Sequence, residues 1–327
     1  MMVGLVVRRL LQLPIILLVI YTLTLTLAWA IPGNPLENPE GRRPPAEVEA
    51  AMKAQYNLDS FPKFYWSYLE NATGVRWLRD AAAGRSAGPD AVPRPVFDFG
   101  PSLFYDDWTV NEIIASSLPV SATLGFLAIL IAVVFGVGAG VIGSVRPNSA
   151  ADLATLSVAL VGISLPSFVI GTVFLLVFPV WLGWGRVGVS VGAADLILPA
   201  VTLSMPFAAY IARLTRMGMI DCLGADYIRT ARAKGLPERT VLLKHALKNA
   251  FLPVLSYLGP ATAAAMTGSF VVEQVFNVPG MGQFFVNGVQ NKDLFLIMGV
   301  VLIFATMLIV FNLIVDVLYR WVDPRIE

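Results

Sequence analysis

The feature that most constrains the fold of this chain is a set of six apolar runs, none of which contains a charged residue. A helix needs about 20 largely apolar residues to cross the hydrocarbon layer of a membrane, which is roughly 30 Å thick. The runs cover 10–36, 113–145, 153–185, 196–212, 249–272 and 294–315, and Leu214 and Met217 extend the fourth. With 57% hydrophobic and 14% charged residues, the chain is expected to be an all-α integral membrane protein with six transmembrane helices.

Small residues and proline occur inside these runs, as at Gly136, Gly138, Gly140, Gly143 and Pro166. Small side chains allow helix backbones to approach closely in lipid, so we expect the helices to form a packed bundle. Pro166 lies within the third run, which we interpret as a single span.

The first run has two interpretations. Arg8 and Arg9 precede it, and Ala28, Trp29 and Ala30 close it, which is the pattern of a signal peptide with a small-residue cleavage site. The apolar part of a signal peptide is usually about 7 to 15 residues long, whereas this run holds about 20. We therefore interpret it as an uncleaved membrane anchor.

Basic residues gather on one side of the membrane if all six runs cross it. Arg8 and Arg9 precede the first run, Arg146 lies between the second and third, and Arg320 and Arg325 follow the sixth. The segment 213–248 adds eight basic residues against three acidic ones. Because short cytoplasmic loops carry an excess of lysine and arginine, both termini and this segment are predicted to be cytoplasmic.

The predicted spans divide the chain into three parts. Residues 1–31 form a cytoplasmic tip and the first transmembrane helix, 32–112 form an extracytoplasmic insertion, and 113–327 form a core with a polar cytoplasmic loop at 218–250. The insertion contains more acidic than basic residues, together with proline, glycine and aromatic residues. It is either a small cap or docking surface or a solvated connection between two spans, and both interpretations stay open.

The cytoplasmic loop is predicted to hold a helix, a glycine turn and a second helix. Good helix formers run from Asp226 to Lys234, and Gly235 can adopt the left-handed conformation that closes a helix. Leu236 can then fold back as the apolar contact that accompanies such a cap. Pro237 and Glu238 suit the first turn of the next helix.

Two kinds of partner suit such a loop, namely anionic lipid headgroups and a groove in another protein. A small, smooth apolar surface among the charges favours the protein groove. It is formed by Ala225, Ala231, Ala233, Gly235 and Leu236.

The sequence lacks the residues that several other activities need. Cys222 is the only cysteine and His245 the only histidine, so neither an intrachain disulfide nor a cluster of metal ligands is expected. No segment matches the phosphate-binding pattern G-x-x-x-x-G-K-[ST], so the chain is not expected to hydrolyse ATP. The middles of the spans lack charged residues, which disfavours an intramembrane enzyme or an ion-coupled carrier, although sodium sites built from backbone carbonyls stay compatible with the sequence.

The segment RTARAKGLPERTVLLKHALKNAFLPVL resembles the cytoplasmic EAA loop of ABC-transporter permeases, in the form used by the dipeptide and oligopeptide subfamily. Arg229, Thr230, Ala231 and Gly235 match this form, in which the glutamate of the general motif is missing, and a Leu-Pro pair at 252–253 lies further downstream than in the general pattern. Similar stretches follow one another over nearly the whole chain. They are RRLLQLPIILLVIYTLTLTL at 8–27, PGNP at 32–35, SLPSF at 164–168, LPAVTLSMPFAAYIARLTRMGM at 198–219, VVEQVFNVPGMG at 271–282 and the terminal NLIVDVLYRWVDPRIE.

The resemblance implies the type I ABC importer fold and a permease subunit that forms half of a translocation pathway for dipeptides or oligopeptides. In that family the loop forms coupling helices that seat in a groove of an ATPase subunit. The resemblance assigns this role to Asp226, Arg229, Thr230, Ala231, Arg232, Lys234, Gly235, Leu236 and Pro237. It also implies a non-catalytic chain that binds no cofactor and no metal, because ATP and Mg are used by the partner ATPase subunits.

The implied partners are a second homologous permease, two identical or different nucleotide-binding ATPase subunits, an extracytoplasmic substrate-binding protein, the peptide substrate and membrane lipid, with no nucleic acid. The implied location is the plasma (inner) membrane of a bacterium or archaeon. Relatives in the same family import nickel chelates, glutathione or oligosaccharides, and the spans do not separate these substrates from peptides. A more remote alternative is an ion-coupled carrier that works without an ATPase.

The segment NVPGMGQFF at 277–285, between the last two spans, combines turn residues with apolar ones. Apolar side chains are costly to leave in water, so we expect a re-entrant loop that reaches towards the pathway; a plain surface turn is the alternative. The residues assigned to this loop are Glu273, Phe276, Pro279, Gly280, Met281 and Gly282. Glu273 and Asp293 flank the segment, and either is a candidate for contact with substrate or with the binding protein.

Overall fold

The computed structural model of the chain describes residues 2–37, 45–84, 95–184, 192, 194–266 and 270–322. In these residues the chain is helical apart from loops and one isolated bridge between Pro101 and Thr109. The chain forms two compact units. The first contains Met1–Leu10, Val120–Gly282 and Met307–Glu327, and the second contains Leu11–Pro119 and Gln283–Thr306.

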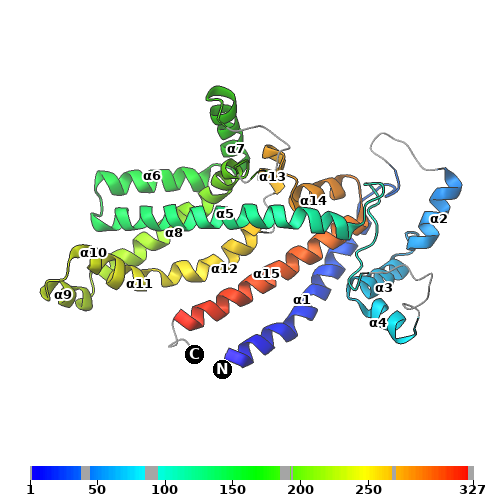
Figure 1. Ribbon diagram of the computed structural model, residues 1–327, viewed down its shortest axis with the longest axis horizontal. Helices are drawn as coiled ribbons and strands as arrows, with labels where there is room; N and C mark the ends of the chain where they lie inside the picture. The colour runs from blue at the N-terminus through cyan, green and yellow to red at the C-terminus, as the bar shows by residue number, and fades with distance from the viewer. Residues whose placement is uncertain are drawn as a thin grey trace. The chain divides into compact units, whose positions relative to one another are not determined.

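Four of the predicted spans are single helices, long and apolar enough to cross a membrane. They are α1 (Met2–Ala30), α5 (Val110–Val145), α8 (Ile197–Leu223) and α15 (Leu294–Val322), which Figure 1 shows as long ribbons. A helix bonds its own backbone N–H and C=O groups, which is what a lipid environment without water requires. The prediction of an all-helical membrane protein is therefore confirmed.

The third predicted span is not one straight helix. It consists of α6 (Ala150–Ser164) and α7 (Ser167–Leu175), which continues as a π-helical segment, η2 (Leu176–Trp181), and the two parts meet at an angle of 104°. Pro166 has no N–H to continue α6, and it forces the preceding Leu165 into an extended conformation with ψ near 130°. The run predicted as the third span, 153–185, is therefore bent at its proline (Figure 1).

The fifth predicted span, 249–272, is described on both sides of 267–269. The helix α12 covers Leu252–Met266, and its 15 residues correspond to about 22 Å. The next described helix is α13 (Phe270–Phe276), and 267–269 lie outside the described residues. By length and composition, the described helices supply four membrane spans, or five if α6 and α7 count as one.

Glycines allow α5 and α8 of the first unit to pack with their backbones close together. A Cβ atom at Gly136 would lie 2.6 Å from the carbonyl oxygen of Ala208, and one at Gly140 would lie 2.6 Å from that of Ala212. Gly138, between them, has no neighbour within 4 Å. The expected close packing of small residues is therefore confirmed for Gly136 and Gly140 but not for Gly138.

The apolar core of the first unit lies between α5, α8 and the helices that follow α8. One cluster joins α5 and α8 to α13; its buried residues include Leu124, Leu203, Val272 and Phe276. A second buried group, Ala132, Ile211 and Val254, joins α5 and α8 to α12. The first cluster holds α13, and the second holds α12, against the two long helices.

The second unit is organised by aromatic side chains from the predicted insertion. Its helices are α2 (Ala46–Tyr56), α3 (Phe61–Ala72) and α4 (Val75–Ala82). The rings of Phe64 and Tyr68 on α3 are buried, and their centroids lie 5.3 Å and 5.8 Å from that of Phe295 at the start of α15. Tyr21 of α1 donates a hydrogen bond to the carbonyl of Tyr65, at 2.6 Å. A packed aromatic core favours the cap interpretation of the insertion over a solvated connection.

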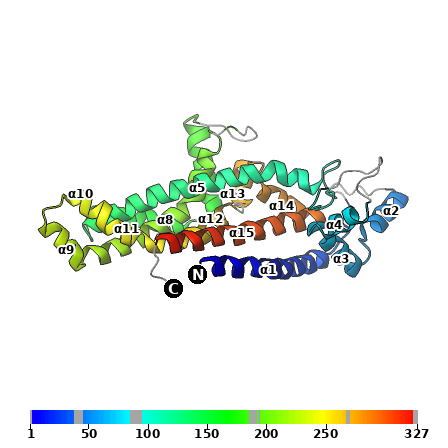
Figure 2. The same ribbon diagram turned by 60° about the horizontal axis from the view of Figure 1, so that its bottom comes forward.

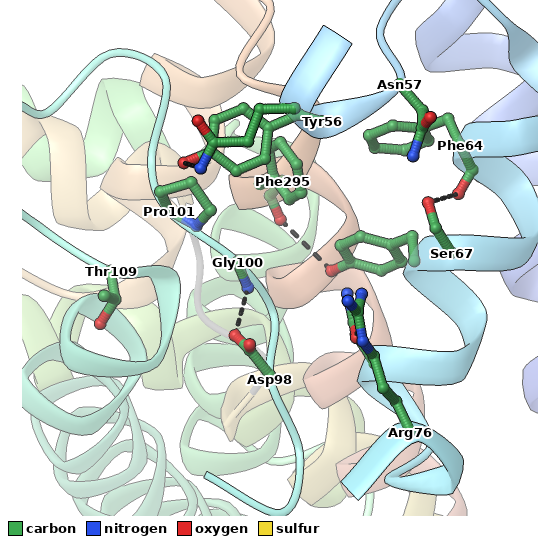
Figure 3. Close-up of a pocket in the computed structure, with 13 residues that line it drawn as sticks. Tyr56, Asn57, Phe64, Ser67, Arg76, Asp98, Gly100, Pro101, Thr109 and Phe295 are labelled. Carbon is green, nitrogen blue, oxygen red and sulfur yellow. Dashed lines mark hydrogen bonds between the residues drawn. The ribbon is translucent and has the colours of Figure 1, made fainter. Parts of the chain in front are cut away.

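A cavity of about 390 Å³ opens beside this aromatic core. Figure 3 shows Tyr56, Asn57 and Phe295 on one side of it, and Arg76 and Asp98 on the other. The Asp98 carboxylate accepts a hydrogen bond from the Gly100 N–H at 2.9 Å, and the Tyr68 hydroxyl donates to the carbonyl of Phe295 at 3.5 Å. The cavity wall is thus part of the packing that orders the insertion.

The aromatic core generates a stability prediction. Replacing Phe64 by Ala is expected to lower the free energy of unfolding of the second unit by about 3–5 kcal/mol, because a buried ring is removed and a cavity is left. Trp66 on the same helix is 63% exposed, so Trp66→Ala is expected to change the free energy by less than about 0.5 kcal/mol. Native-state proteolysis of the purified chain measures both, and equal effects would contradict the aromatic core.

Candidate functional site

The polar segment that was predicted to be cytoplasmic folds into a compact helical loop after α8. It consists of α9 (Asp226–Ala233), the short α10 (Glu238–Thr240), a π-helical segment η3 (Val241–Ala246) and α11 (Leu247–Ala250). Figures 1 and 2 both show these elements at the C-terminal end of α8. We refer to residues 226–250 as the 226–250 loop.

The chain reverses direction at Gly235, which has φ of 76°. The Gly235 N–H donates to the carbonyl of Arg232 at 2.9 Å, and the Leu236 N–H donates to the carbonyl of Ala231 at 3.3 Å. This pair of hydrogen bonds is the Schellman cap, which satisfies the last carbonyls of a helix. The predicted helix, glycine turn and helix are confirmed, with Pro237 preceding the second helix rather than lying inside it.

A forked ion pair spans the turn. Arg232 on α9 donates from Nη2 to Oε1 of Glu238 at 2.7 Å, and from Nε to Oε2 at 3.2 Å. The hydrogen bond from Arg232 holds the pKa of the Glu238 carboxyl below its usual value, and Glu238 raises the pKa of Arg232. Within this structure Arg232 therefore helps to fix the angle between α9 and α10.

The inner face of the 226–250 loop is apolar and buried. Its buried residues come from the end of α8, from α9 and from the helices after the turn; they are Met219, Ile228, Ala231, Val241, Ala246 and Ala250. Ala231 was predicted to belong to the apolar surface that enters a partner's groove, and this is wrong because the alanine faces the loop's own core. Its small size instead suits the packing of α9 against η3.

The outer face of the loop carries the other residues that were predicted to couple to an ATPase. Asp226, Arg229, Thr230, Arg232, Lys234, Gly235, Leu236 and Pro237 are all exposed. The Leu236 N–H closes the cap, and the Leu236 side chain is 37% exposed. The loop thus presents charges around the exposed Leu236 at its glycine turn.

A second candidate site surrounds Glu273 on α13. This carboxylate is fully buried in the first unit, where Oε1 accepts from the Ser121 hydroxyl at 2.8 Å and Oε2 accepts from the Gly282 N–H at 2.8 Å. Ser121 on α5 in turn accepts from the Met281 N–H at 2.8 Å. Glu273 and Ser121 therefore bind the backbone of 281–282 and hold it against α5.

The segment after α13 has no room for larger residues. A Cβ atom at Gly280 would lie 2.5 Å from Glu273 Oε2 and from Ser121 Oγ, and one at Gly282 would lie 2.7 Å from the Cα of Phe270. Phe276, Gly280, Met281 and Gly282 are buried, and Pro279 is half-buried. The alternative of a plain surface turn is therefore wrong, whereas an approach to the pathway stays a prediction.

Neither of the two carboxylates that were candidates for contact with substrate or binding protein lies at the surface. Glu273 and Asp293 are both fully buried, so neither presents its oxygens at a surface. In the second unit Asp293 precedes α15, accepts from the Leu296 N–H at 3.1 Å and binds the Ser102 hydroxyl and the Leu103 and Phe104 N–H groups. Burial raises the pKa of the Asp293 carboxyl, and these hydrogen bonds act in the opposite direction. Both carboxylates order the backbone.

Sequence reasoning missed Ser121, and it missed Asp152 and Arg216, which form a buried pair in the first unit. Nothing local marks Ser121, because its partner lies 152 positions away. Asp152 does carry a signal, since the spacing of Ser149 and Asp152 matches the [ST]-x-x-[DE] pattern at a helix start. In the described part of the chain, no three histidine, cysteine or carboxylate side chains come together as a metal site would require.

Two consecutive segments of the chain match families of transport-system membrane components. Residues 132–327 match the family described as "Binding-protein-dependent transport system inner membrane component". Residues 2–125 match "Binding-prot-dependent transport system membrane comp, N-term".

Relatives from several bacteria align with the chain from end to end. The chain is 40% identical over 329 residues to the oligopeptide transport system permease protein OppB of Haemophilus influenzae, and the alignment covers 100% of both. It is 41% identical over 329 residues to OppB of Escherichia coli strain K12, again with 100% of both covered. It is 38% identical over 312 residues to the dipeptide transport system permease protein DppB of Bacillus subtilis, covering 95% of this chain and 94% of the relative.

The left-handed conformation of Gly235 generates the next prediction. Gly235→Ala is expected to destabilise the turn by about 1–2 kcal/mol, because a Cβ is disfavoured at this φ although no neighbour lies within 4 Å. Gly235→Asn is expected to cost less, since Asn visits this region more readily. Hydrogen exchange at the Leu236 amide reports the cap. Equal exchange rates for both variants would contradict backbone strain as the cause.

The tight packing of Gly280 generates a second prediction. Gly280→Ala is expected to destabilise the first unit by about 1–3 kcal/mol, because the added methyl overlaps the Glu273 and Ser121 oxygens. Gly138→Ala is the matched control, since Gly138 lies in a helix with open space around it, and it is expected to leave stability unchanged or to raise it by up to about 1 kcal/mol. Unfolding of the purified chain in detergent measures both, and a harmless Gly280→Ala would contradict the packing.

Proposed function

Because the chain belongs to the family of binding-protein-dependent transport system inner membrane components, we propose that it is the permease subunit of an ATP-driven importer of oligopeptides or dipeptides. The observation that carries this proposal is full-length similarity to OppB and DppB permeases at about 40% identity. The chain is an inner membrane protein with several apolar helices, and it acts as a non-catalytic subunit. Peptide is the substrate class that the names of these relatives support.

The 226–250 loop is the part of the chain that docks to an ATPase subunit and is moved by it. Its inner face is tied to α8 by a buried apolar core, and the glycine cap and the Arg232–Glu238 fork fix its turn. Its outer face leaves Leu236 and several charged residues exposed. A rigid body with an exposed apolar tip suits insertion into a groove of another protein. Asp226, Arg229, Thr230, Lys234, Gly235, Leu236 and Pro237 form the docking face. Ala231 supports this face from within, and the exposed Arg232 supports it through its ion pair with Glu238.

The proposed topology has six spans, with both termini and the 226–250 loop in the cytoplasm, in the type I ABC importer fold. α6 with α7 forms the third span, and α12 together with the segment of α13 forms the fifth. Residues 1–31 then carry the first span, 32–112 the extracytoplasmic cap, and 113–327 the core. The excess of basic residues at 213–248 supports this orientation. The segment 276–282, whose backbone is bound by Glu273, lies on the extracytoplasmic side as a re-entrant loop next to the pathway.

The complete transporter needs further subunits. They are a second homologous permease that supplies the other half of the pathway, two nucleotide-binding ATPase subunits, identical or different, and an extracytoplasmic substrate-binding protein. ATP and Mg are bound by the ATPase subunits, and this chain needs no cofactor of its own. Closure of the ATPase pair would move the 226–250 loop and shift the permeases between inward-open and outward-open states.

Reconstitution tests the proposed function. The chain is incorporated into liposomes with its partner permease, ATPases and binding protein, and ATP-dependent uptake of a labelled peptide is measured. Leu236→Asp is expected to lower uptake and ATPase co-purification by about tenfold, which corresponds to about 1.4 kcal/mol of lost docking. The matched control is Leu78→Asp in the insertion, where the leucine is 61% exposed, and it is expected to keep ATPase binding.

Two other outcomes would contradict the proposed energy source or the proposed substrate. Uptake by the chain without any ATPase would establish the ion-coupled carrier instead. ATP-dependent uptake of a nickel chelate, glutathione or an oligosaccharide with no uptake of peptides would retain the ABC permease and reject the peptide substrate.

A further inference from the structure

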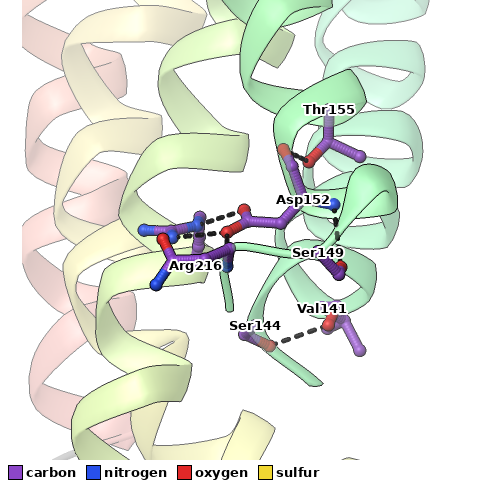
Figure 4. A network of polar contacts seen from close by, with 7 residues as sticks. Val141, Ser144, Ser149, Asp152, Thr155 and Arg216 are labelled. Carbon is purple, nitrogen blue, oxygen red and sulfur yellow. Dashed lines mark hydrogen bonds and ion pairs between the residues drawn. The ribbon is translucent and has the colours of Figure 1, made fainter. Parts of the chain in front are cut away.

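Asp152 closes the turn between α5 and α6 in the first unit. α5 ends at Val145 and α6 begins at Ala150, with Ser149 as the residue that caps α6. The Ser149 hydroxyl accepts from the Asp152 N–H at 3.3 Å, and Oδ2 of Asp152 accepts from the Asn148 N–H at 2.8 Å. Figure 4 shows Asp152 at this turn, with its carboxylate directed towards Arg216 on α8. The carboxylate is therefore fixed by its own turn.

Arg216 binds this carboxylate with two parallel hydrogen bonds. Nε donates to Oδ1 at 2.6 Å and Nη2 donates to Oδ2 at 2.7 Å. The Asp152 side chain is fully buried and that of Arg216 is 20% exposed. The planar fork of arginine matches a carboxylate in one orientation, so the pair fixes both the distance and the angle between α6 and α8.

α5 is shaped to admit this pair. A Cβ atom at Gly143 would lie 3.0 Å from Asp152 Oδ1 and 3.5 Å from Arg216 Cδ. At Gly140 it would lie 2.5 Å from the Cβ of Thr215, the neighbour of Arg216. Two glycines on one face of α5 thus let α6 and α8 come together beside it. The ends of three helices meet at one ion pair.

The same end of α8 leads into the 226–250 loop. Arg216 lies two turns before the last residue of α8, Leu223, a distance of about 10 Å along the axis. Between them Met219 is fully buried in the apolar core that also contains Ile228 of α9, and a Cβ atom at Gly218 would lie 2.8 Å from the carbonyl of Ala250. The loop is therefore packed directly onto the segment of α8 that Arg216 holds.

From this arrangement we propose that Asp152 and Arg216 are positioning residues that make α6 and α8 move together with the 226–250 loop. The inference rests on the proposed function for the source of movement, namely the ATPase, but the rigid link between α6, α8 and α9 is a property of this chain alone. A buried ion pair adds little to stability compared with well-packed apolar side chains, and its best-attested use is to fix register. Loss of the fork with the charge kept, as in Arg216→Lys, is expected to leave the fold in place and to loosen the angle between the helices.

The first test measures that angle in the full chain without partners. The single native cysteine is removed as Cys222→Ser, and spin labels are attached through Ala233→Cys on α9 and Leu160→Cys on α6. The distribution of label distances in nanodiscs is expected to be narrow with the native pair and broad in Asp152→Asn and in Arg216→Lys, which keeps the charge but loses the fork. The charge-reversed double variant, Asp152→Arg with Arg216→Asp, is expected to restore part of the narrow distribution.

The chain offers a matched control pair. Arg9 on α1 and Asp316 on α15 also form an arginine–aspartate pair in the first unit, at 2.8 Å, but both side chains are substantially exposed. Arg9→Lys and Asp316→Asn are expected to leave the distance distribution unchanged. Distributions for Asp152→Asn and Arg216→Lys that are as narrow as those of the control pair would overturn the proposal.

The second test measures coupling in the reconstituted transporter. Peptide taken up per ATP hydrolysed is expected to fall about fivefold or more in Asp152→Asn and Arg216→Lys, the range of a typical coupling free energy, with complex assembly unchanged. A purely structural role would lower assembly and leave this ratio unaltered, and an unaltered ratio would overturn the proposal. Failure of the native chain to show ATP-driven uptake would reject the proposed function alone, because the spin-label measurement needs no ATPase.

Discussion

The organisation of this chain follows from the need to satisfy every backbone polar group without water. Within the long helices this happens automatically, but each reversal of the chain exposes N–H groups that need another acceptor. Three fully buried carboxylates meet this need. Asp152 accepts from the turn before α6, Glu273 from the segment after α13, and Asp293 from the start of α15 and from the loop at 102–104.

Each of these carboxylates also fastens its turn to a distant part of the same unit. Asp152 binds Arg216 on α8, Glu273 binds Ser121 on α5, and Asp293 binds the Ser102 hydroxyl. Leaving a buried carboxylate uncompensated is costly, so such a link persists only where its geometry is satisfied. The reversals of the chain are therefore also the points at which it is attached to distant parts of the same unit. The 226–250 loop differs because it uses a glycine cap and an exposed ion pair.

Features that depend on neighbouring residues were predictable from the sequence. The long spans follow from apolar length, and the turn at Gly235 follows from a glycine placed just after a helical pattern. The break before Pro166 was also visible, because proline disfavours the helical conformation of the residue before it, but the apolar length of the run outweighed that signal. A helix cap forms between neighbouring residues and needs no distant partner, whereas a bend needs room that only packing provides.

Features that depend on distant contacts were not predictable. Glu273 and Asp293 had the character of ligand-binding carboxylates near a loop, and only the partners at Ser121 and Ser102 reveal them as anchors of the backbone. Ala231 matched the pattern of a docking residue, yet it lies on the side of α9 that is buried with Met219 and Val241. The most direct measurement of the central claim places a photo-crosslinking amino acid at Leu236, with exposed Leu160 on α6 as the control, in the assembled transporter. Crosslinking of position 236, but not of position 160, to the ATPase subunit is the predicted result; equal or absent crosslinking at both would contradict the claim that the 226–250 loop docks there.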